Sequence, residues 1–241
     1  MEKTSVDIVV PVYYGNIKEL RKNIPKQVNF FRKNFNDYNW NVIISINGSN
    51  ASEIIELSKN LSKKYNNLKY IYFKEAGKGV GVMEAWKKSN ADIITYMDID
   101  LSTDLKYFRN LINPIEQGYD ICIGSRYHKN SKMKRSFLRH FISSFYHIIF
   151  MKIILNTKYT DSQCGFKAVN KKVVKEILPL VKDKFWFFET EFLYIAQKKG
   201  FKIKEIPIMW EEDITLKSGV NLIKIIFDFI EKVILLRLRK I

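Results

Sequence analysis

Two aspartates separated by one residue, Asp98 and Asp100, follow an apolar stretch of the chain. Residues 93–97 are rich in Ile and Thr, which favour a buried strand, so the carboxylates come where that strand leaves its sheet. In an open parallel sheet this edge forms the ligand crevice, and paired carboxylates there suit Mg²⁺ or Mn²⁺ holding the phosphates of a nucleotide. The alternative is a pair of solvated loop acids, because a short Asp-x-Asp motif also occurs by accident.

Arg126 follows another strand-like stretch, residues 119–123. A planar guanidinium can bind a phosphate through two hydrogen bonds while it stays charged, and the strand-end position favours this role over a surface salt bridge. Arg139 and Ser143 are one helical turn apart, so both side chains can face one phosphate. An ordinary helix-surface hydroxyl remains an open alternative for Ser143.

The elements that must position these residues alternate in type along the first half of the chain. Strand-like apolar runs alternate with helix-like stretches around Leu20, Leu57, Trp86 and Phe108. The expected strands are residues 6–12, 42–46, 68–73, 93–97 and 119–123. This βαβ pattern predicts an α/β fold whose mostly parallel central sheet is flanked by helices.

Composition sets the outer limits of the fold and its surroundings. The chain has 241 residues, 46% of them hydrophobic, which is enough to bury a full core. The two cysteines, Cys122 and Cys164, are most simply reduced thiols of a cytosolic protein, and the N-terminus shows no secretory leader. The net charge of +16 suits nucleic acid, an anionic membrane surface or phosphorylated substrates.

Two segments indicate contact with a membrane surface without crossing it. Residues 132–155 begin with basic side chains and continue as an apolar helix, and residues 213–241 form an amphipathic helix with a basic end. Charged residues interrupt every apolar run before it reaches the roughly 20 residues that a spanning helix needs. Packing of the C-terminal helix on its own domain remains an equal alternative.

The glycines Gly77, Gly79 and Gly81 do not match a dinucleotide fingerprint or a phosphate-gripping loop. A glycine turn with Lys78 beside it can still present N–H groups and a positive charge to a phosphate. A plain turn between strand and helix is the alternative.

Motifs along most of the chain resemble family 2 glycosyltransferases of the GT-A fold, in the branch that acts on polyprenyl and dolichyl phosphate. In chain order they are PVYYGN from Pro11, NGSNAS from Asn47, GKGVGVMEAW from Gly77, YMDIDLSTD from Tyr96, GSRY from Gly124, DSQCGFKAVNKKV from Asp161 and FFETEFLYIAQKKGFKIKEIPIMW from Phe187. The resemblance implies a catalytic domain over residues 1–212, followed by a membrane-interface helix over 213–241.

The resemblance also implies roles for individual residues at positions that match its motifs. The nucleotide sugar would contact Pro11, Val12, Tyr13 and Asp98, with Asn47 and, from the glycine turn, Lys78 as further candidates. The metal would be held by Asp98 and Asp100, and the lipid phosphate by Arg126, Arg139 and Ser143. Catalytic roles would fall to Asp98 and Asp100, with Asp161 and Glu191 as further candidates, Glu191 to orient the donor sugar or the acceptor. An acid on the face of an amphipathic helix remains an equal alternative for Glu191.

Two departures from the family pattern concern the nucleotide. Tyr14, Gly15 and Asn16 stand where relatives often carry Asn-Glu, and Asn47 stands where they usually place an acid. An amide oxygen accepts a hydrogen bond from a base more weakly than a carboxylate does, so the choice of base stays open.

We therefore expect a metal-dependent, inverting hexosyltransferase, using Mg²⁺ or Mn²⁺, on the cytosolic face of a membrane. The donor would be UDP-glucose or GDP-mannose, with glucose favoured, and the acceptor a polyprenyl or dolichyl phosphate. A membrane-anchoring subunit is possible, and nucleic acid is not expected as a partner. The rivals are mannosyl transfer to the same lipid, a family 2 transferase acting on a saccharide, and a metal-free module that binds polyanions or membranes.

Overall fold

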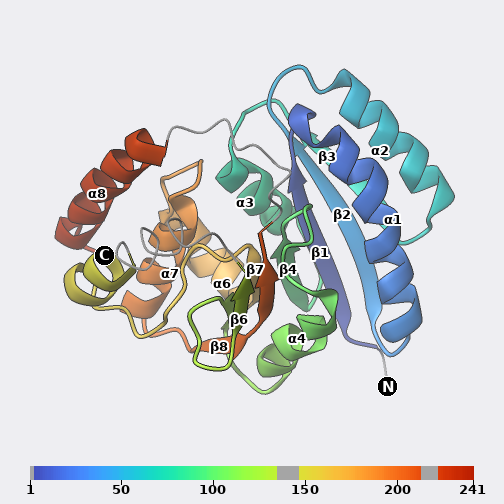
Figure 1. The fold of residues 1–241 in the computed structure, drawn as a ribbon. Helices are drawn as coiled ribbons and strands as arrows, with labels where there is room; N and C mark the ends of the chain where they lie inside the picture. The colour runs from blue at the N-terminus through green and yellow to red at the C-terminus, as the bar shows by residue number, and fades with distance from the viewer. Residues whose placement is uncertain (1–2, 135–146, 213–221) are drawn as a thin grey trace.

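The centre of the molecule is a seven-stranded sheet with the strand order β3-β2-β1-β4-β7-β5-β8 (Figure 1). Six strands run in the same direction and β7 is antiparallel to both of its neighbours. Our computed structural model describes residues 3–134, 147–212 and 222–241. The strands of the sheet are β1 (Ser5–Val12), β2 (Asn39–Asn47), β3 (Leu68–Phe73), β4 (Ile93–Met97), β5 (Ile121–Ser125), β7 (Phe166–Asn170) and β8 (Ile203–Pro207).

Helices cover both faces of this sheet, as the α/β pattern predicted (Figure 1). The α-helices are α1 (Ile17–Asn34), α2 (Ser52–Lys64), α3 (Lys78–Lys88), α4 (Phe108–Glu116), α6 (Lys171–Glu176), α7 (Phe188–Lys198) and α8 (Leu222–Leu238). Short helical turns lie at Tyr14–Asn16, Leu105–Tyr107 and Leu178–Leu180, and a π-helical segment spans His147–Ile154.

Alternation along β1 divides the core into two layers. Val6, Ile8 and Val10 face a cluster that contains the apolar residues of α1, α2 and α4, whereas Val9 faces a second cluster under α3, α6, α7 and α8. Successive side chains of a strand point to opposite faces, so a strand buried on both sides must be apolar throughout. This explains the run of Ile8, Val9 and Val10 at the centre of β1.

The strands predicted in the first half of the chain are present, with small shifts at their ends. β2 begins three residues earlier than its predicted range of 42–46, and β5 lies two residues later than its predicted range of 119–123. β7 and β8 were not predicted from the sequence pattern. β7 inserts between β4 and β5, so the two halves of the sheet are joined by a strand that comes later in the chain.

Helix α8 packs on the domain through one face and exposes another. Phe229, Val233 and Leu236 are buried in the second core, while Leu235 and Leu238 are 60% and 74% exposed. Within the described residues, no helix combines the length and the apolar character that crossing a membrane would need. Of the predicted interface segment 132–155, residues 135–146 lie outside the described part of the chain.

A second, two-stranded sheet lies beside the end of β4. It pairs β6 (Lys132–Lys134) with β9 (Met209–Glu211) in parallel. β9 also forms an isolated bridge between Trp210 and Thr103. The chain that follows Asp100 is thereby fixed against a segment more than a hundred residues later.

Candidate active site

The acids Asp98 and Asp100 lie where β4 ends, as the sequence predicted. The backbone N–H of Asp98 donates to the carbonyl of Gly165, and that of Ser102 donates to Oδ1 of Asp100 at 2.9 Å. Leu101 has a positive φ of 59°, so the chain turns sharply directly after the second acid. The turn keeps the two carboxylates at the edge of the sheet.

Gly165 is required by the closeness of Asp98. A Cβ atom at position 165 would overlap the carboxylate of Asp98. The glycine therefore lets the loop before β7 pass directly beside the acid, because only glycine lacks a Cβ atom. This gives the glycine of the DSQCGF motif a steric reason.

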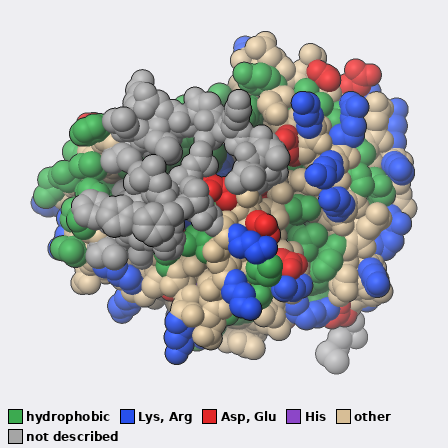
Figure 2. Space-filling model, in the orientation of Figure 1, with side chains coloured by type: hydrophobic (Ala, Val, Ile, Leu, Met, Phe, Trp, Pro, Cys, Tyr) green, Lys and Arg blue, Asp and Glu red, His purple; other side chains and the backbone are tan. Residues whose placement is uncertain are grey.

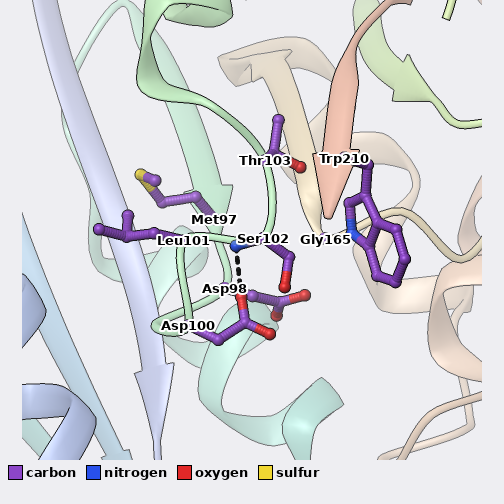
Figure 3. Close-up of a pocket in the computed structure, with 8 residues that line it drawn as sticks. All are labelled: Met97, Asp98, Asp100, Leu101, Ser102, Thr103, Gly165 and Trp210. Carbon is purple, nitrogen blue, oxygen red and sulfur yellow. Dashed lines mark hydrogen bonds between the residues drawn. The ribbon is translucent and has the colours of Figure 1, made fainter. Parts of the chain in front are cut away.

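A small cavity opens at this edge of the sheet (Figure 3). In Figure 3 the side chains of Asp98, Asp100 and Ser102 gather on one side, and the indole of Trp210 stands across from them. The lining residues are Met97, Asp98, Asp100, Leu101, Ser102, Thr103, Gly165 and Trp210.

Lys78 reaches this edge from the start of α3. Its ammonium lies 2.9 Å from Oδ1 of Asp98 and 3.0 Å from Oε1 of Glu189. Glu189 also pairs at 2.6 Å with Lys167, and both side chains of that pair are 1% exposed. The result is a chain of alternating charges, Lys167–Glu189–Lys78–Asp98, which leads from the core to the crevice.

The pKa values along this chain follow from burial and from the neighbouring charges. Burial opposes charge on Lys78, but Asp98 and Glu189 raise its pKa above the usual value. Burial likewise opposes charge on Glu189, yet Lys167 and Lys78 lower its pKa to about 2. Burial raises the pKa of Asp98 even though Lys78 lowers it, and the nearby Asp100 adds to the rise. Lys78 and Glu189 thus stay charged at neutral pH.

The donor set at the end of β4 fits a divalent cation. Asp98 and Asp100 supply hard oxygen ligands, and a bound cation would offset the repulsion between the two carboxylates, which adds to the effect of burial on the pKa of Asp98. Among the residues described, no group of three or more His, Cys, Asp or Glu side chains is placed to hold a metal. The remaining ligands would come from a bound diphosphate and water, which is the usual arrangement for Mg²⁺.

Arg126, directly after β5, is held by a two-pronged ion pair. Its Nε lies 2.7 Å from Oδ2 of Asp161 and its Nη2 lies 2.9 Å from Oδ1. Burial opposes the charge of Asp161, but Arg126 lowers the pKa of Asp161 below its usual value. Asp161 is therefore placed to orient Arg126, and the catalytic role predicted for it remains a prediction.

The predicted nucleotide-binding residues gather at the end of β1. Pro11 and Val12 are the last residues of that strand, and Tyr13 is 49% exposed beyond it. The side chain of Asn47 donates to the carbonyl of Val12 at 3.0 Å and accepts from the N–H of Gly77 at 3.0 Å. Asn47 thus fastens β1 to the glycine turn, and its contact with a base stays a prediction.

The glycine turn has a structural role in this molecule. The N–H groups of Gly79 and Val80 donate to the carbonyls of Phe185 and Lys184 at 3.2 Å each. A Cβ atom at Gly77 would overlap the Lys184 carbonyl. The glycines therefore allow the close approach of another loop, and of the turn's groups it is Lys78 that faces the crevice.

The two glutamates of α7 point to different neighbours. Glu189 contacts Lys78, whereas Oε2 of Glu191 accepts from the N–H groups of Lys182 and Asp183, and its Oε1 pairs with Arg239. The role predicted for Glu191 stays a prediction, and Glu189 is the glutamate that belongs to the charge chain.

Two residues near the crevice were not predicted from the sequence. Lys167 and Trp210 were not singled out, although both lie within the motifs that carry the resemblance. A lysine in an otherwise apolar strand was the available signal for Lys167. The predicted lipid-phosphate residues Arg139 and Ser143 lie outside the described residues.

Several proteins are similar to this one over most of its length. Glycosyltransferase AglD of Haloferax volcanii is 26% identical over 208 residues, which are 86% of this chain and 33% of that protein. Dolichyl-phosphate beta-glucosyltransferases of Dictyostelium discoideum and Saccharomyces cerevisiae are 28% and 26% identical, covering 86% and 88% of this chain. The chain spans 66% and 68% of the length of these two relatives.

Solved structures with the same fold include glucosyl-3-phosphoglycerate synthase from Mycobacterium tuberculosis in complex with Mn²⁺, UDP and phosphoglyceric acid. The two structures have a TM-score of 0.64 at 10% identity, and the matched part covers 97% of this chain and 77% of the synthase chain. Mannosyl-3-phosphoglycerate synthase from Rubrobacter xylanophilus has a TM-score of 0.66 at 10% identity, with 98% and 74% covered. At such low identity these structures establish the fold alone. The family model for glycosyl transferase family 2 matches residues 7–178, and this chain is a member of that family.

Proposed function

We propose that this protein transfers a hexose, with glucose favoured over mannose, from a nucleoside diphosphate sugar to a polyprenyl or dolichyl phosphate, with inversion at the anomeric carbon. One arrangement carries the proposal. Asp98 and Asp100 line the cavity with Trp210, and the guanidinium of Arg126 lies 5.5 Å from the centre of the same indole. An edge suited to a metal-bound diphosphate therefore neighbours a cation suited to a second phosphate.

On the donor side, Asp98 and Asp100 would hold Mg²⁺ or Mn²⁺, which when bound neutralises charge on the departing diphosphate. Lys78 would add a second positive charge to the same phosphates. Glu189 pairs with the Lys78 ammonium and is itself held by Lys167. The Lys78 ammonium is therefore already ordered when the donor binds. Pro11, Val12 and Tyr13, at the end of β1, would receive the nucleotide.

On the acceptor side, a lipid phosphate is ionised near neutral pH and needs positioning more than a strong general base. Arg126 is suited to that task because Asp161 holds its guanidinium through Nε and Nη2. An arginine has five N–H donors, so three remain for a phosphate. Arg139 and Ser143 would complete this subsite.

The names of the relatives support glucose and dolichyl phosphate over the rival substrates. Several relatives are dolichyl-phosphate beta-glucosyltransferases. Mannosyl transfer from GDP-mannose and transfer to a saccharide are the alternatives within the family. A metal-free polyanion-binding module would not need the paired acids at the cavity.

Position on a membrane surface is a further part of the proposal. Helix α8 exposes Leu235 and Leu238 beside the basic residues Arg237 and Lys240, a combination that suits an anionic lipid surface. The site would then work at the cytosolic face, where a lipid phosphate is within reach. A membrane-anchoring subunit would be an additional partner.

The test is a transfer assay with a matched control. Purified protein would be incubated with Mn²⁺ or Mg²⁺, UDP-glucose or GDP-mannose and a short polyprenyl phosphate, and the glycolipid would be detected by mass. We expect a glucosyl product that EDTA abolishes and that Asp100→Ala reduces by at least about a hundredfold. Asp104→Ala removes an aspartate four residues later that pairs with Lys106 and does not line the cavity, and it should retain most activity. Equal activity of the two variants would contradict the proposal.

A further inference from the structure

Trp210 is held beside the acids by its backbone. It lies in β9, which pairs with β6, and it forms the bridge to Thr103. The N–H of Glu211 donates to the carbonyl of Ser102 at 2.9 Å. Because neighbours on both sides fix this segment, the indole has a defined place relative to Asp100.

The indole borders both subsites of the proposed reaction. It lines the cavity with Asp98 and Asp100 (Figure 3), and the Arg126 guanidinium lies 5.5 Å from its ring centre. Arg126 is itself locked by Asp161, so the distance between the acids and the cation is set by fixed groups on both sides. The indole of Trp210 therefore borders both the two acids and the Arg126 guanidinium.

The geometry of an in-line transfer indicates which part of the substrates would lie beside the Trp210 indole. The anomeric carbon has the departing diphosphate oxygen on one side and the attacking phosphate oxygen on the other. In the proposed reaction the hexose would therefore sit between the diphosphate at Asp98 and Asp100 and the phosphate at Arg126. An aromatic face offers a flat apolar surface to the C–H groups of a sugar ring, and it has few rotatable bonds to immobilise.

We propose that Trp210 contacts the transferred hexose and is a specificity-determining residue of the site. The inference rests on the proposed function. It adds a named contact for the sugar itself, as distinct from the nucleotide and the two phosphates.

The test separates binding of the sugar from binding of the nucleotide. Dissociation constants of UDP-glucose and of UDP would be measured with Mn²⁺ for the wild type, Trp210→Phe and Trp210→Leu. We expect Trp210→Leu to weaken UDP-glucose binding by about tenfold while UDP binding changes less than about twofold. Trp210→Phe keeps an aromatic face and should retain most of the preference.

Trp186 provides the matched control. It is 48% exposed, and the Lys78 ammonium lies 5.1 Å from its ring centre, so it belongs to the diphosphate side. Trp186→Leu should weaken UDP and UDP-glucose binding by the same factor. If Trp210→Leu also weakens both equally, or weakens neither, Trp210 does not contact the hexose.

A second measurement keeps Trp210 intact. In a Trp186→Phe background the other tryptophans, Trp40 and Trp86, are buried in the core, so Trp210 reports on the crevice. UDP-glucose should change the fluorescence more than UDP does, and identical changes would overturn the inference. Failure of the proposed function gives a different result: the wild type would bind nucleotide sugar with the predicted Trp210 dependence yet form no glycolipid.

Discussion

Arg239 and Glu191 join the end of helix α8 to helix α7 through an ion pair of 2.6 Å. Arg239 also donates to the carbonyl of Leu180, and Glu191 accepts from the backbone of Lys182 and Asp183. Lys184 and Phe185, which follow Asp183, accept hydrogen bonds from the glycine turn at Val80 and Gly79. The C-terminal helix is thus fastened to the chain segment that packs beside the donor side of the site.

Replacement of Arg239 should therefore destabilise the fold. Arg239→Met leaves the buried Glu191 carboxylate with two backbone donors and no cation, which should cost about 1–3 kcal/mol of unfolding free energy. Arg237→Met, on the exposed side of the same helix, should stay within about 0.5 kcal/mol of the wild type. Urea unfolding of both variants gives the comparison, and equal effects would show that the ion pair contributes nothing.

Gly77 and Gly118 allow two effects of a glycine to be separated. Both have positive φ, 142° and 87°, but a Cβ atom would collide with the Lys184 carbonyl at Gly77 and would meet nothing within 4 Å at Gly118. Gly118→Ala should cost about 1–2 kcal/mol from conformation alone. Gly77→Ala should cost about 3 kcal/mol or more. If the two variants have equal unfolding free energies, the loop at Lys184 moves to make room for the Cβ atom at position 77.

Asp161→Asn tests whether the ion pair positions Arg126. Loss of the carboxylate charge leaves the guanidinium without its buried partner, which should lower the unfolding free energy by about 3 kcal/mol. It should also raise the KM for polyprenyl phosphate about tenfold while the dissociation constant of UDP stays unchanged. Kinetics with varied acceptor and calorimetry with UDP would measure the two quantities. A change in UDP affinity of the same size would assign Asp161 to the whole site instead.

Acid should weaken the fold in a defined pH window because of Glu189. Its pKa is about 2 in the folded protein against 4.5 for the free side chain, so folding favours the ionised form. The stabilisation is complete above pH 4.5 and is lost as the pH falls toward 2. It amounts to about 3 kcal/mol. Glu189→Gln should be less stable at pH 6 and lose less on acidification, which urea unfolding at pH 6, 4 and 3 would reveal.

The exposed leucines of α8 should mediate binding to lipid. Leu235 and Leu238 are 60% and 74% exposed, and Leu235→Glu or Leu238→Glu would place a negative charge on this face of α8. Each substitution should reduce co-sedimentation with phosphatidylserine vesicles by about tenfold. Tyr72→Glu changes an exposed aromatic residue on β3, at the other edge of the sheet, and is the control. Unchanged vesicle binding of the leucine variants would show that α8 does not contact the membrane surface.

Positive charge over the surface of α1 and α2 is a broader feature of the molecule (Figure 2). In Figure 2 Lys and Arg side chains are spread over the side where these two helices lie, with few acids among them. Such a field attracts any polyanion and does not select a partner. The vesicle experiments should therefore be run at several salt concentrations, since the α8 contribution is apolar and persists when charge is screened.

The sequence by itself determined the alternating elements of the first half and the place of the acids. Periodicity of two and of 3.6 residues is a local property, so β1 to β4 and their helices could be predicted. The end of an apolar strand is local too, which located Asp98, Asp100 and Arg126.

Only the tertiary structure decided how these residues are connected. β7 could not be placed from its pattern, because its position between β4 and β5 depends on pairing with segments far away in the chain. The same is true of the choice between Glu189 and Glu191. Both are acids on one buried helix, and Glu189 lies in the charge chain because Lys167, from β7, is buried beside it. Burying a lysine costs too much unless a partner is present, and that partner is known only once the chain has folded.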